Sequence, residues 1–568
     1  MLRIPGAEVA RARKESGLFI PVGVPHKGLN TRSPFSAMDP NEAISLNNVV
    51  VESYGLRTRK GYTEWAVGFP TTAPIHSVLS YFPATTVVAA SASSQLYEDM
   101  VGLMMVQPRS NAGPGPGIIF AAQGTSVYNV TAGGVGPWTA ELGITGVGPY
   151  WNGVNYQNVA GNVYLAANEG GGYAIYNGTT WVMPVAGITP TDIEGLDPTT
   201  IVWVTTWKER VWFLAKDSSI AYYLPAGQIT GKVTAFEFGT QMDHGGKASW
   251  LGGWTVDGGA GTDDYLVCCG SQGDVVIYKG IDPDDATTFS LHGVWYSGPL
   301  PVGHRCVEAG GGDIQILTQY GVLPLSKLLQ PTHLAATLQQ HTSYPIDPLI
   351  ATLMRDYSTT VGWQAFSLPR EELMLIRIPE LANTVNTQSF LAYKTTTQTW
   401  SVLSRLPYAH TLTTGSAIYA GTLDGRVVRA FDGPLDNVKI GESSGAGIFC
   451  RVTPAYHDLG DKGKNKQIKM VRPYFLATIY PEVVFSLLVN YMAPVVVVRP
   501  TVPVNVPTAK WSVDKWDVGK WGGLLRPLHQ WFGAVGWGHT ATVQLDYTTG
   551  GDTLLTNIDY WVSQGGVM

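Results

Sequence analysis

The middle of the chain alternates short apolar runs with turns rich in glycine, asparagine and aspartate. The unit GNVYLAANEGGGYAIYNGTTWVMPV (161–185) predicts an apolar strand, a strand ending in tyrosine, a polar turn and an aromatic strand. Related units begin at residues 117, 209, 264, 388 and 415. Repeats spaced by roughly 30–50 residues and built from about four strands are typical of β-propeller blades.

This pattern predicts a mostly β protein with a β-propeller-like central domain over residues 74–440. A single blade cannot cover both of its own faces, so blades stack around an axis. Asn-Gly in Tyr176–Trp181 and Asp-Gly in Leu423–Arg426 are strong hairpin signals. We expect six to eight blades, and a set of unrelated antiparallel sandwiches is the alternative.

Two segments break the strand pattern and predict helices. They are LSKLLQPTHLAATLQQ (325–340) and DPLIATLMRDYS (347–358), the second with an Asp-Pro start and apolar positions at helical spacing. We expect them to form a short helical insertion near 325–358, and insertions on a rigid scaffold often carry contacts.

The two ends of the chain differ from the middle. Residues 1–73 predict an irregular docking segment with the first strands: a basic helix or arm at Arg11–Gly17, a helix start at Asp39–Pro40, a strand from Asn48 and an exposed strand over 56–62. Residues 441–568 predict an antiparallel β-sandwich-like domain. Its halves are joined by a tryptophan-rich connector, 510–523.

The connector repeats a pentad that begins with Lys-Trp, so that its three tryptophans lie five residues apart. This spacing fits neither a helix nor a strand. We expect each tryptophan to fill a separate hollow, either as a clasp within the C-terminal domain or at an interface with a neighbour.

Composition supports a β-rich fold and limits the possible ligands. Only 14% of the residues are charged, while there are 66 glycines and 36 prolines, which favours short strands and turns over solvated helices. The net charge of −6 argues against a protein that binds nucleic acid by neutralising phosphates. It is compatible with a duct through which DNA slides without binding.

The cysteines and the apolar runs exclude several classes. Cys268, Cys269, Cys306 and Cys450 lack metal-ligand spacing, so we expect reduced thiols in the core. The first residues lack the apolar region of a signal peptide, and no apolar run approaches the ~20 residues of a membrane-spanning helix.

No pattern in the sequence specifies catalysis, a metal or a cofactor, so we expect a protein that is not an enzyme. Phosphate-binding loops, nucleophile elbows and zinc motifs are all missing from the sequence. The acidic run 282–288 lacks the ligand spacing of a calcium loop, so a solvated turn is favoured. Glu209, Asp217 and Glu237 are acidic residues of the kind that propeller glycosidases pair, but sequence does not show convergence.

Basic and aromatic residues provide the candidate interface. The basic groups fit either hydrated loops or contacts with an acidic neighbouring subunit. The candidate interface residues are Trp511, Trp516, Trp521, Lys510, Lys515, Arg57, Arg59, Lys60, Lys462, Lys464 and Lys466.

Three segments in a fixed order resemble tail nozzle (tail tube) proteins of short-tailed bacteriophages. The first is GLNTRSPFSAMDPNEAISLNNVVVESYGLRTRKGYTEW (28–65). The others are KQIKMVRPYFLA with VVFSLLVNY (466–491), and AKWSVDKWDVGKWGG with HQWFGAVGWGHTATVQLDY (509–547). The lysine before each tryptophan of the pentads departs from the family pattern, which puts the contacts there in doubt.

The resemblance implies a structural protein of the virion, assembled in the host cytoplasm. It implies a homo-hexamer around a DNA ejection channel, with a tail adaptor or portal-complex protein and a tail fibre or spike protein as neighbours. We expect acidic and small polar side chains to line the lumen, so that DNA passes without specific binding. A carbohydrate-binding or carbohydrate-cleaving propeller is the alternative; a kelch-like cellular scaffold explains neither terminus.

Overall fold

The structure is a computed structural model that divides into two compact units. It describes residues 17–83, 117–143, 148, 150–257, 262–310, 312–330, 341–379, 388–413, 417–460, 462–492, 496–498 and 525–564. One unit joins residues 1–58 to 447–568, and the other spans 59–446. The described residues of 17–58 therefore belong with the C-terminal part of the chain, whereas the sequence predicts divisions at 73/74 and 440/441.

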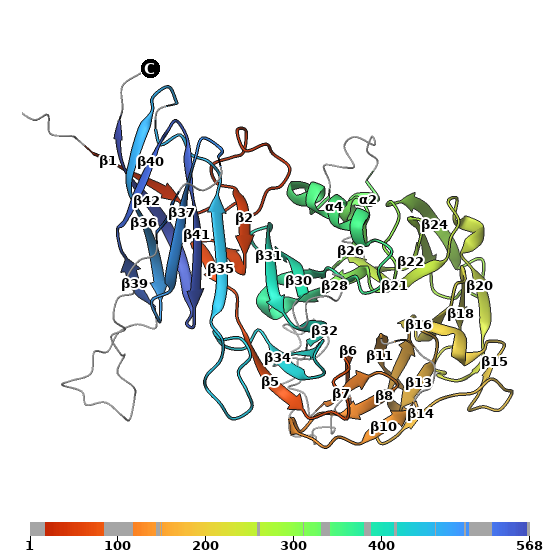
Figure 1. The fold of residues 1–568 in the computed structure, drawn as a ribbon. Helices are drawn as coiled ribbons and strands as arrows, with labels where there is room; N and C mark the ends of the chain where they lie inside the picture. Colours follow the sequence, from red (N-terminus) through yellow and green to blue (C-terminus); the bar gives the residue numbers. More distant parts are fainter. Residues whose placement is uncertain are drawn as a thin grey trace, which may run out of the picture. The chain divides into compact units, whose positions relative to one another are not determined.

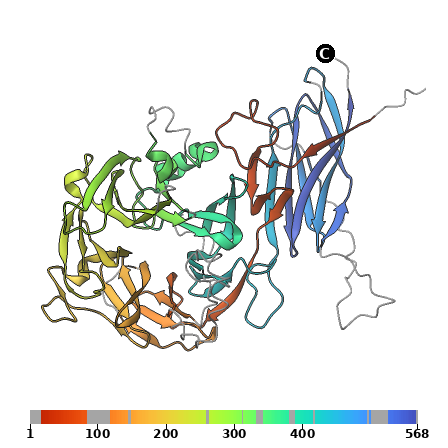
Figure 2. The same cartoon turned by 180° about the vertical axis from the view of Figure 1, so that it is seen from behind.

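Within the described residues, the unit 59–446 holds seven blades of three or four antiparallel strands, arranged as in a propeller (Figure 1, Figure 2). Consecutive inner strands contact each other, as in the pairs β6–β11, β11–β16, β16–β21, β25–β28 and β32–β6. The inner strands are β6 (Ile75–Tyr81), β11 (Trp151–Asn158), β16 (Ile201–Trp207), β21 (Ala248–Asp257), β25 (Val307–Gly310), β28 (Gln364–Leu368) and β32 (Tyr408–Thr413). The mostly β class and the propeller are confirmed, with a blade number inside the expected range.

The remaining strands complete the blades outward from each inner strand. In chain order they are β7 (Ile118–Gln123), β8 (Ser126–Asn129) and β10 (Ala140–Gly143); β12 (Gly161–Asn168), β13 (Tyr173–Tyr176) and β14 (Trp181–Val182); β17 (Arg210–Ala215), β18 (Ile220–Tyr223) and β20 (Thr234–Glu237); β22 (Thr262–Gly270), β23 (Asp274–Gly280) and β24 (Phe289–Tyr296); β26 (Asp313–Thr318) and β27 (Gly321–Pro324); β29 (Leu373–Arg377), β30 (Gln388–Lys394) and β31 (Thr399–Leu406); and β33 (Ile418–Thr422) and β34 (Val427–Ala430). A two-stranded parallel sheet joins β15 (Ile193–Glu194) to β19 (Gly231–Lys232).

The repeated aromatic positions of the sequence lie between neighbouring blades. Phe120 of the first blade has its ring centroid 4.9 Å from that of Tyr176 and 5.0 Å from that of Trp181, both in the second blade. These rings belong to one buried cluster shared by the two blades. Each blade thus covers an apolar face of the next, which explains why tyrosine and tryptophan recur with the blade period.

The last blade is closed by a strand from the beginning of the unit. Strand β5 (Tyr62–Val67) pairs antiparallel with β34, and β9 (Gly134–Val135) pairs parallel with β5. Just before β5, the buried Arg59 donates two hydrogen bonds of 2.7 Å to the Asp436 carboxylate. The expectation of an exposed strand over 56–62 was wrong, because Leu56 and Arg59 are buried.

Helices take the outer position of the three-stranded blade. Helix α4 (Asp347–Tyr357) packs against β27, as the sequence predicted for 347–358. Of the helix predicted over 325–340, the structure shows α2 (Leu325–Leu328), which contacts β26 and β27. Residues 331–340 lie outside the described residues. Short 3-10 turns lie at Pro198–Thr200, Gly239–Gln241, Tyr344–Ile346 and Pro369–Glu371.

The two glycine turns predicted as hairpins are confirmed. Gly178 (φ 98°) lies in the turn between β13 and β14, and Gly425 (φ 77°) lies in the turn between β33 and β34. Both positions need a left-handed backbone, which glycine adopts without a steric penalty.

The other unit is a two-layer antiparallel sandwich built from both ends of the chain. One sheet has the strand order β3-β4-β42-β36-β39, and in addition β1 pairs with β42 and β40 pairs with β36. The strands of this sheet are β1 (Leu18–Gly23), β3 (Val49–Glu52), β4 (Gly55–Thr58), β36 (Lys466–Ala477), β39 (Arg526–His529), β40 (Phe532–Gly538) and β42 (Thr553–Gln564). The second sheet runs β2 (Ala43–Asn47), β35 (Ile448–Pro454), β41 (Ala541–Thr549), β37 (Glu482–Val489) and β38 (Val496–Val498).

Aromatic pairs fill the space between the two layers. Phe475 packs on Tyr547 at 5.3 Å and Phe485 on Phe532 at 5.7 Å, each pair joining one sheet to the other. All four cysteines are buried and none forms a disulfide, as expected. Among the described residues, no helix is long and apolar enough to cross a membrane.

One local prediction near the N-terminus was wrong. Asp39–Pro40 does not start a helix; the chain turns there and strand β2 begins at Ala43. The Asp39 carboxylate accepts a hydrogen bond from the Asn41 amide (2.9 Å), and the Glu42 carboxylate accepts one from the Asp39 amide (3.1 Å). These side chains close a turn on the backbone, which competes with helix formation. The predicted basic arm, Arg11–Gly17, lies outside the described residues except for Gly17.

Candidate functional site

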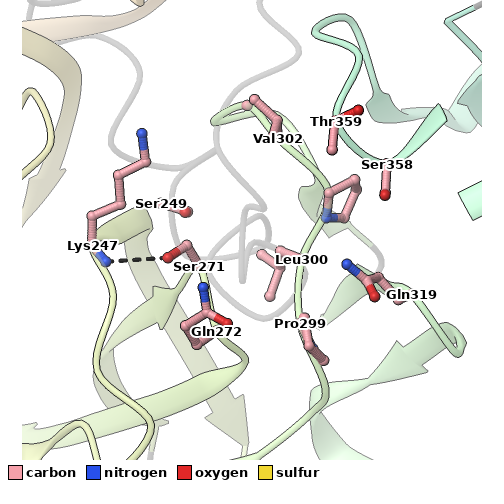
Figure 3. Close-up of a pocket in the computed structure, with 12 residues that line it drawn as sticks. Lys247, Ser249, Ser271, Gln272, Pro299, Leu300, Val302, Gln319, Ser358 and Thr359 are labelled. Atoms are coloured by element: carbon pink, nitrogen blue, oxygen red, sulfur yellow. Dashed lines mark hydrogen bonds between the residues drawn. The ribbon is translucent and has the colours of Figure 1, made fainter. Parts of the chain in front are cut away.

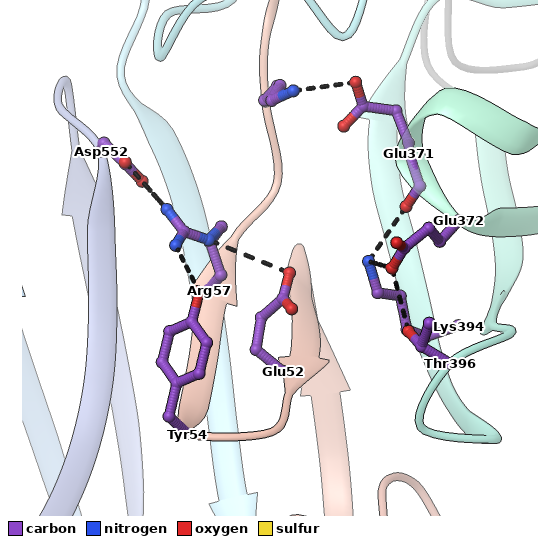
Figure 4. Close-up of polar contacts among 9 residues, drawn as sticks. Glu52, Tyr54, Arg57, Glu371, Glu372, Lys394, Thr396 and Asp552 are labelled. Atoms are coloured by element: carbon purple, nitrogen blue, oxygen red, sulfur yellow. Dashed lines mark hydrogen bonds and ion pairs between the residues drawn. The ribbon is translucent and has the colours of Figure 1, made fainter.

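The predicted basic residues near the end of the N-terminal segment make contacts within their own units (Figure 4). In the sandwich, Arg57 donates to the Asp552 carboxylate at 2.8 and 2.9 Å and to the Tyr54 hydroxyl at 3.1 Å. In the propeller, the Lys60 ammonium lies 2.8 Å from the Glu371 carboxylate. Arg59 is buried against Asp436, so it is not a surface group.

The second predicted basic group, Lys462, Lys464 and Lys466, belongs to the sandwich. Its members differ in their exposure to solvent. Lys466 is fully buried and donates to the backbone oxygens of Lys464 and His539. Lys462 is exposed, with its ammonium 3.7 Å from the Asp458 carboxylate. Lys510, Trp511, Lys515, Trp516 and Trp521 lie outside the described residues.

The structure instead shows an exposed apolar surface that the sequence analysis did not select. We call it the aromatic face: the exposed Phe19, Met470, Val535, Trp537 and Trp561, together with the half-buried Trp531 and with Arg472, which stacks on Trp531 and Phe19. Register places these residues on one side of the sheet, because Trp561 of β42 is opposite both Phe19 of β1 and Met470 of β36. Val535 is 71% exposed and Trp537 is 52% exposed.

The opposite side of the same strands is the sandwich core. Phe532 and Ala534 of β40 are buried, while Gly533 and Val535 point outward. Strand β40 therefore carries apolar side chains on both of its sides. The sequence FGAVGWG alternates larger and smaller residues, as a strand with one buried side would. In most such strands the solvent-facing positions are polar, so the sequence alone did not indicate exposed valine and tryptophan.

Arg472 is held among the aromatic rings by charge and stacking. Its guanidinium carbon lies 4.4 Å from the ring centroid of Trp531, 4.6 Å from that of Tyr474 and 5.6 Å from that of Phe19. Its Nη2 donates to the buried Asp559 carboxylate at 2.9 Å. A fixed arginine among tryptophans is the composition of binding hot spots in protein interfaces.

The propeller contains a pocket of about 300 Å³ (Figure 3). It is lined by the start of β21, the β22–β23 turn, the segment before β25, the β26–β27 turn and the residues that follow α4. Its walls include Lys247, Ser271, Gln272 and Gln319, and the Lys247 amide donates to the Ser271 hydroxyl at 3.1 Å. The twelve residues that line it include no aspartate, glutamate or histidine. This pocket therefore lacks the carboxylate pair that glycoside hydrolysis uses.

Two of the acidic residues singled out in the sequence form ion pairs in separate places. The carboxylate of Asp217, which was considered for catalysis, lies 2.7 Å from the Lys247 ammonium. The carboxylate of Asp282, from the acidic run 282–288, lies 2.6 Å from an Arg210 nitrogen. Among the described residues, no group of three or more His, Cys, Asp or Glu side chains has the arrangement of a metal site.

A buried polar cluster joins non-adjacent blades across the propeller axis. Arg305, before β25, has its Nε 3.0 Å from the Glu169 carboxylate, after β12. Its guanidinium also lies 4.0 Å from the Tyr150 ring centroid, and the His76 ring lies 4.9 Å from the same ring. Arg377 of β29 donates to Gln388 and to a backbone oxygen on β32.

The electrostatics of this axial cluster keep its histidines neutral. Burial lowers the pKa of His76 to about 4, and the positive charges of Arg377 and Arg305 add to this effect. Burial and the same two arginines also hold the pKa of His410 well below its usual range. Among the described residues named here, the cluster therefore sets the charges of Arg305 and Arg377 against the carboxylate of Glu169.

Glu308 on the inner strand β25 gives a testable pH dependence. Desolvation raises its pKa from 4.5 to about 7, although its carboxylate accepts a hydrogen bond from the Ser367 amide (3.0 Å). Because the pKa of Glu308 is higher in the folded than in the unfolded protein, the folded state favours the protonated carboxyl. The resulting stability is fully present below the unfolded-state pKa and is lost as the pH rises through about 7. Glu308→Gln should therefore be more stable than the wild type by about 1–3 kcal/mol near pH 8.

Urea denaturation of both proteins at two pH values checks this prediction. Near pH 4 the two free energies of unfolding should agree, because Glu308 is protonated in both states and glutamine has the same shape. A difference between variant and wild type that does not change with pH would contradict it.

Comparison with known proteins gives likenesses only among solved structures. No protein-family model matches the sequence, and no curated protein matches it. The chain is similar to the exo-beta-1,3-galactanase of Phanerochaete chrysosporium at 11% identity and a TM-score of 0.22, covering 72% of this chain and 95% of that one.

Two structures of BBS1N in complex with ARL6DN are also similar. The mercury-soaked form matches at 11% identity and a TM-score of 0.22, covering 55% of this chain and 74% of that chain. The lead-soaked form matches at 14% identity and a TM-score of 0.21, covering 37% and 72%. At these TM-scores the likenesses carry no argument about function.

Proposed function

We propose that this chain is a structural virion protein of a short-tailed bacteriophage, a tail nozzle subunit that assembles into a ring around the DNA ejection channel. The aromatic face carries the proposal. Contiguous exposed tryptophan, valine and phenylalanine side chains around a fixed arginine mark surfaces that bind other proteins. Because a ring subunit has neighbours on two sides, it needs such a surface for assembly.

The placement of the phage-like segments also supports the proposal. Segment 28–65 contributes β2, β3 and β4 to the sandwich, 466–491 contributes β36 and β37, and the described part of 509–547 contributes β39, β40 and β41. Strands of the second and third segments pair directly, β36 with β39 and β40, and β37 with β41. Strand β35, which lies outside the three segments, joins β2 of the first segment to β41. Segments far apart in the sequence thus build one body, which gives their joint resemblance a physical basis.

The axial cluster fills the interior of the propeller, and this bears on the path of DNA in the proposed ring. Glu169 and Arg305 come from non-adjacent blades and meet with Tyr150 inside the propeller. DNA therefore does not thread a single propeller, and the channel lies between copies of the chain. The acidic balance of the whole chain, −6, suits a lumen that repels phosphate.

A charge placed in the aromatic face tests the assembly role. Val535→Asp should abolish ring formation, because a carboxylate would have to lose its hydration inside an apolar interface. Val535 is already exposed, so the fold should remain intact. Val159→Asp is the matched control, because Val159 is fully exposed and belongs to the propeller, not to the sandwich that carries the aromatic face.

Sedimentation velocity with circular dichroism measures both assembly and fold. The wild type and the Val159→Asp variant are expected to assemble, and the Val535→Asp variant is expected to be folded but unassembled. Equal assembly of all three proteins would remove the aromatic face from the proposal. Mass spectrometry of purified virions tests the location, and a chain missing from them would overturn the tail assignment.

A further inference from the structure

A second hollow lies in the sandwich, at a cluster of loops between strands. Its volume is about 540 Å³, within the range of small-ligand pockets. Four connections line it: the loop before β2 with Phe35 and Asp39, the β35–β36 loop with Tyr456, Asp458 and Lys462, the turn after β37 with Tyr491, and the turn before β41 with Thr540.

Three aromatic rings form one wall of this loop pocket. The Tyr456 ring centroid lies 4.6 Å from that of Tyr491 and 6.3 Å from that of Phe35. Tyr456 is buried behind the other two, whereas Phe35 is 50% exposed and Tyr491 is 43% exposed. The wall therefore presents exposed ring surface on a fixed support.

The backbone holds Tyr491 in an uncommon conformation. Asn490 and Tyr491 have φ values of 51° and 62°, in the left-handed region that a bulky residue such as tyrosine rarely adopts. The Asn490 side chain fixes the turn, because its Oδ1 accepts hydrogen bonds from the His539 amide (2.9 Å) and the Thr540 amide (3.3 Å). Strain of this kind is concentrated at sites that bind ligands.

Hydrogen-bond acceptors and hydrogen-bond donors both surround the aromatic wall. Asp39 and Asp458 supply acceptors, and the exposed Lys462 ammonium supplies donors. The Thr540 hydroxyl lines the pocket and, within the described structure, is buried without a hydrogen-bond partner. Lys27 lies 2.6 Å from Asp39 and holds the pKa of that carboxyl below its usual range, so Asp39 is a charged acceptor.

We propose that this loop pocket binds a neutral saccharide, with a sugar ring stacked on Tyr491 and Phe35. A sugar offers an apolar ring face for the aromatic wall and hydroxyl groups that both donate and accept hydrogen bonds. The two carboxylates disfavour phosphate and nucleic acid. The inference rests on the sandwich alone and does not depend on the tail assignment.

Saturation-transfer NMR with free sugars tests the site. The probes are D-galactose, D-glucose, N-acetyl-D-glucosamine and L-rhamnose, with choline as a cationic probe. Transfer to the ring protons of at least one sugar is expected with the full-length protein. Tyr491→Asn should weaken that binding by about ten-fold, the loss of one aromatic stacking contact.

The variants are chosen so that folding and binding are separable. Asparagine tolerates the left-handed backbone at position 491, and Phe35→Ala removes a second, half-exposed ring. Tyr320→Asn is the control, because Tyr320 is equally exposed and lies in the propeller. No transfer to any of the sugars, unchanged binding in folded Tyr491→Asn and Phe35→Ala variants, or binding of choline alone would overturn the proposal.

Discussion

Asp436→Ala is expected to destabilise the propeller by about 3–5 kcal/mol, because it leaves the Arg59 charge buried without its carboxylate. The Arg59 side chain is 1% exposed, and both of its bonds to Asp436 measure 2.7 Å. Arg59 lies just before β5, the strand that closes the last blade, and Asp436 follows β34, to which β5 pairs, so loss of the ion pair also loosens the closure of the ring of blades.

Asp432→Ala is the matched control for this variant. Asp432 lies four residues away and pairs with Arg429 at 3.7 Å, with both side chains well exposed. Exposed pairs contribute about 0–1 kcal/mol. Urea denaturation of the two variants should separate them, and equal losses would contradict the account. The double variant Arg59→Met/Asp436→Leu should recover much of the stability, because no buried charge remains.

Glu169→Ala is expected to lower the free energy of unfolding by a similar amount, about 3–5 kcal/mol, because it removes the carboxylate partner of the buried Arg305. Arg305 and Glu169 are both buried. Removal of the carboxylate leaves Arg305 with its contacts to Gln364 (3.3 Å) and to the Tyr150 ring, neither of which carries a negative charge. The second arginine of the cluster, Arg377, then adds repulsion between like charges.

Glu194→Ala is the control for the axial cluster. Glu194 lies 3.5 Å from Lys232, and both side chains are exposed, so its removal should change the free energy of unfolding by less than about 1 kcal/mol. Thermal denaturation followed by circular dichroism measures both variants. If Glu169→Ala unfolds at the wild-type temperature, the cluster does not hold the blades together.

The blades were predictable from sequence because their signals are local and repeated. Each blade has the same order of strands and turns, and Tyr176 and Trp181 lie at positions that every such unit needs to cover its neighbour. Helix α4 was also predictable, because its apolar spacing and Asp-Pro start lie within one short segment.

The rest depends on contacts between distant parts of the chain. Arg59 is buried by Asp436, which lies 377 residues away in sequence, and no local pattern identifies such a partner. The aromatic face was missed for a related reason: β40 is apolar on both sides, and only its pairing with β36 shows which side meets the second sheet. The tryptophan pentads remain a prediction, since they lie outside the described residues.

Electron microscopy of the purified protein tests the central claim most directly. The account predicts six-fold rings for the wild type, and single particles of unchanged fold for Val535→Asp. A wild type that remains monomeric at every concentration examined would contradict a ring-forming tail nozzle subunit.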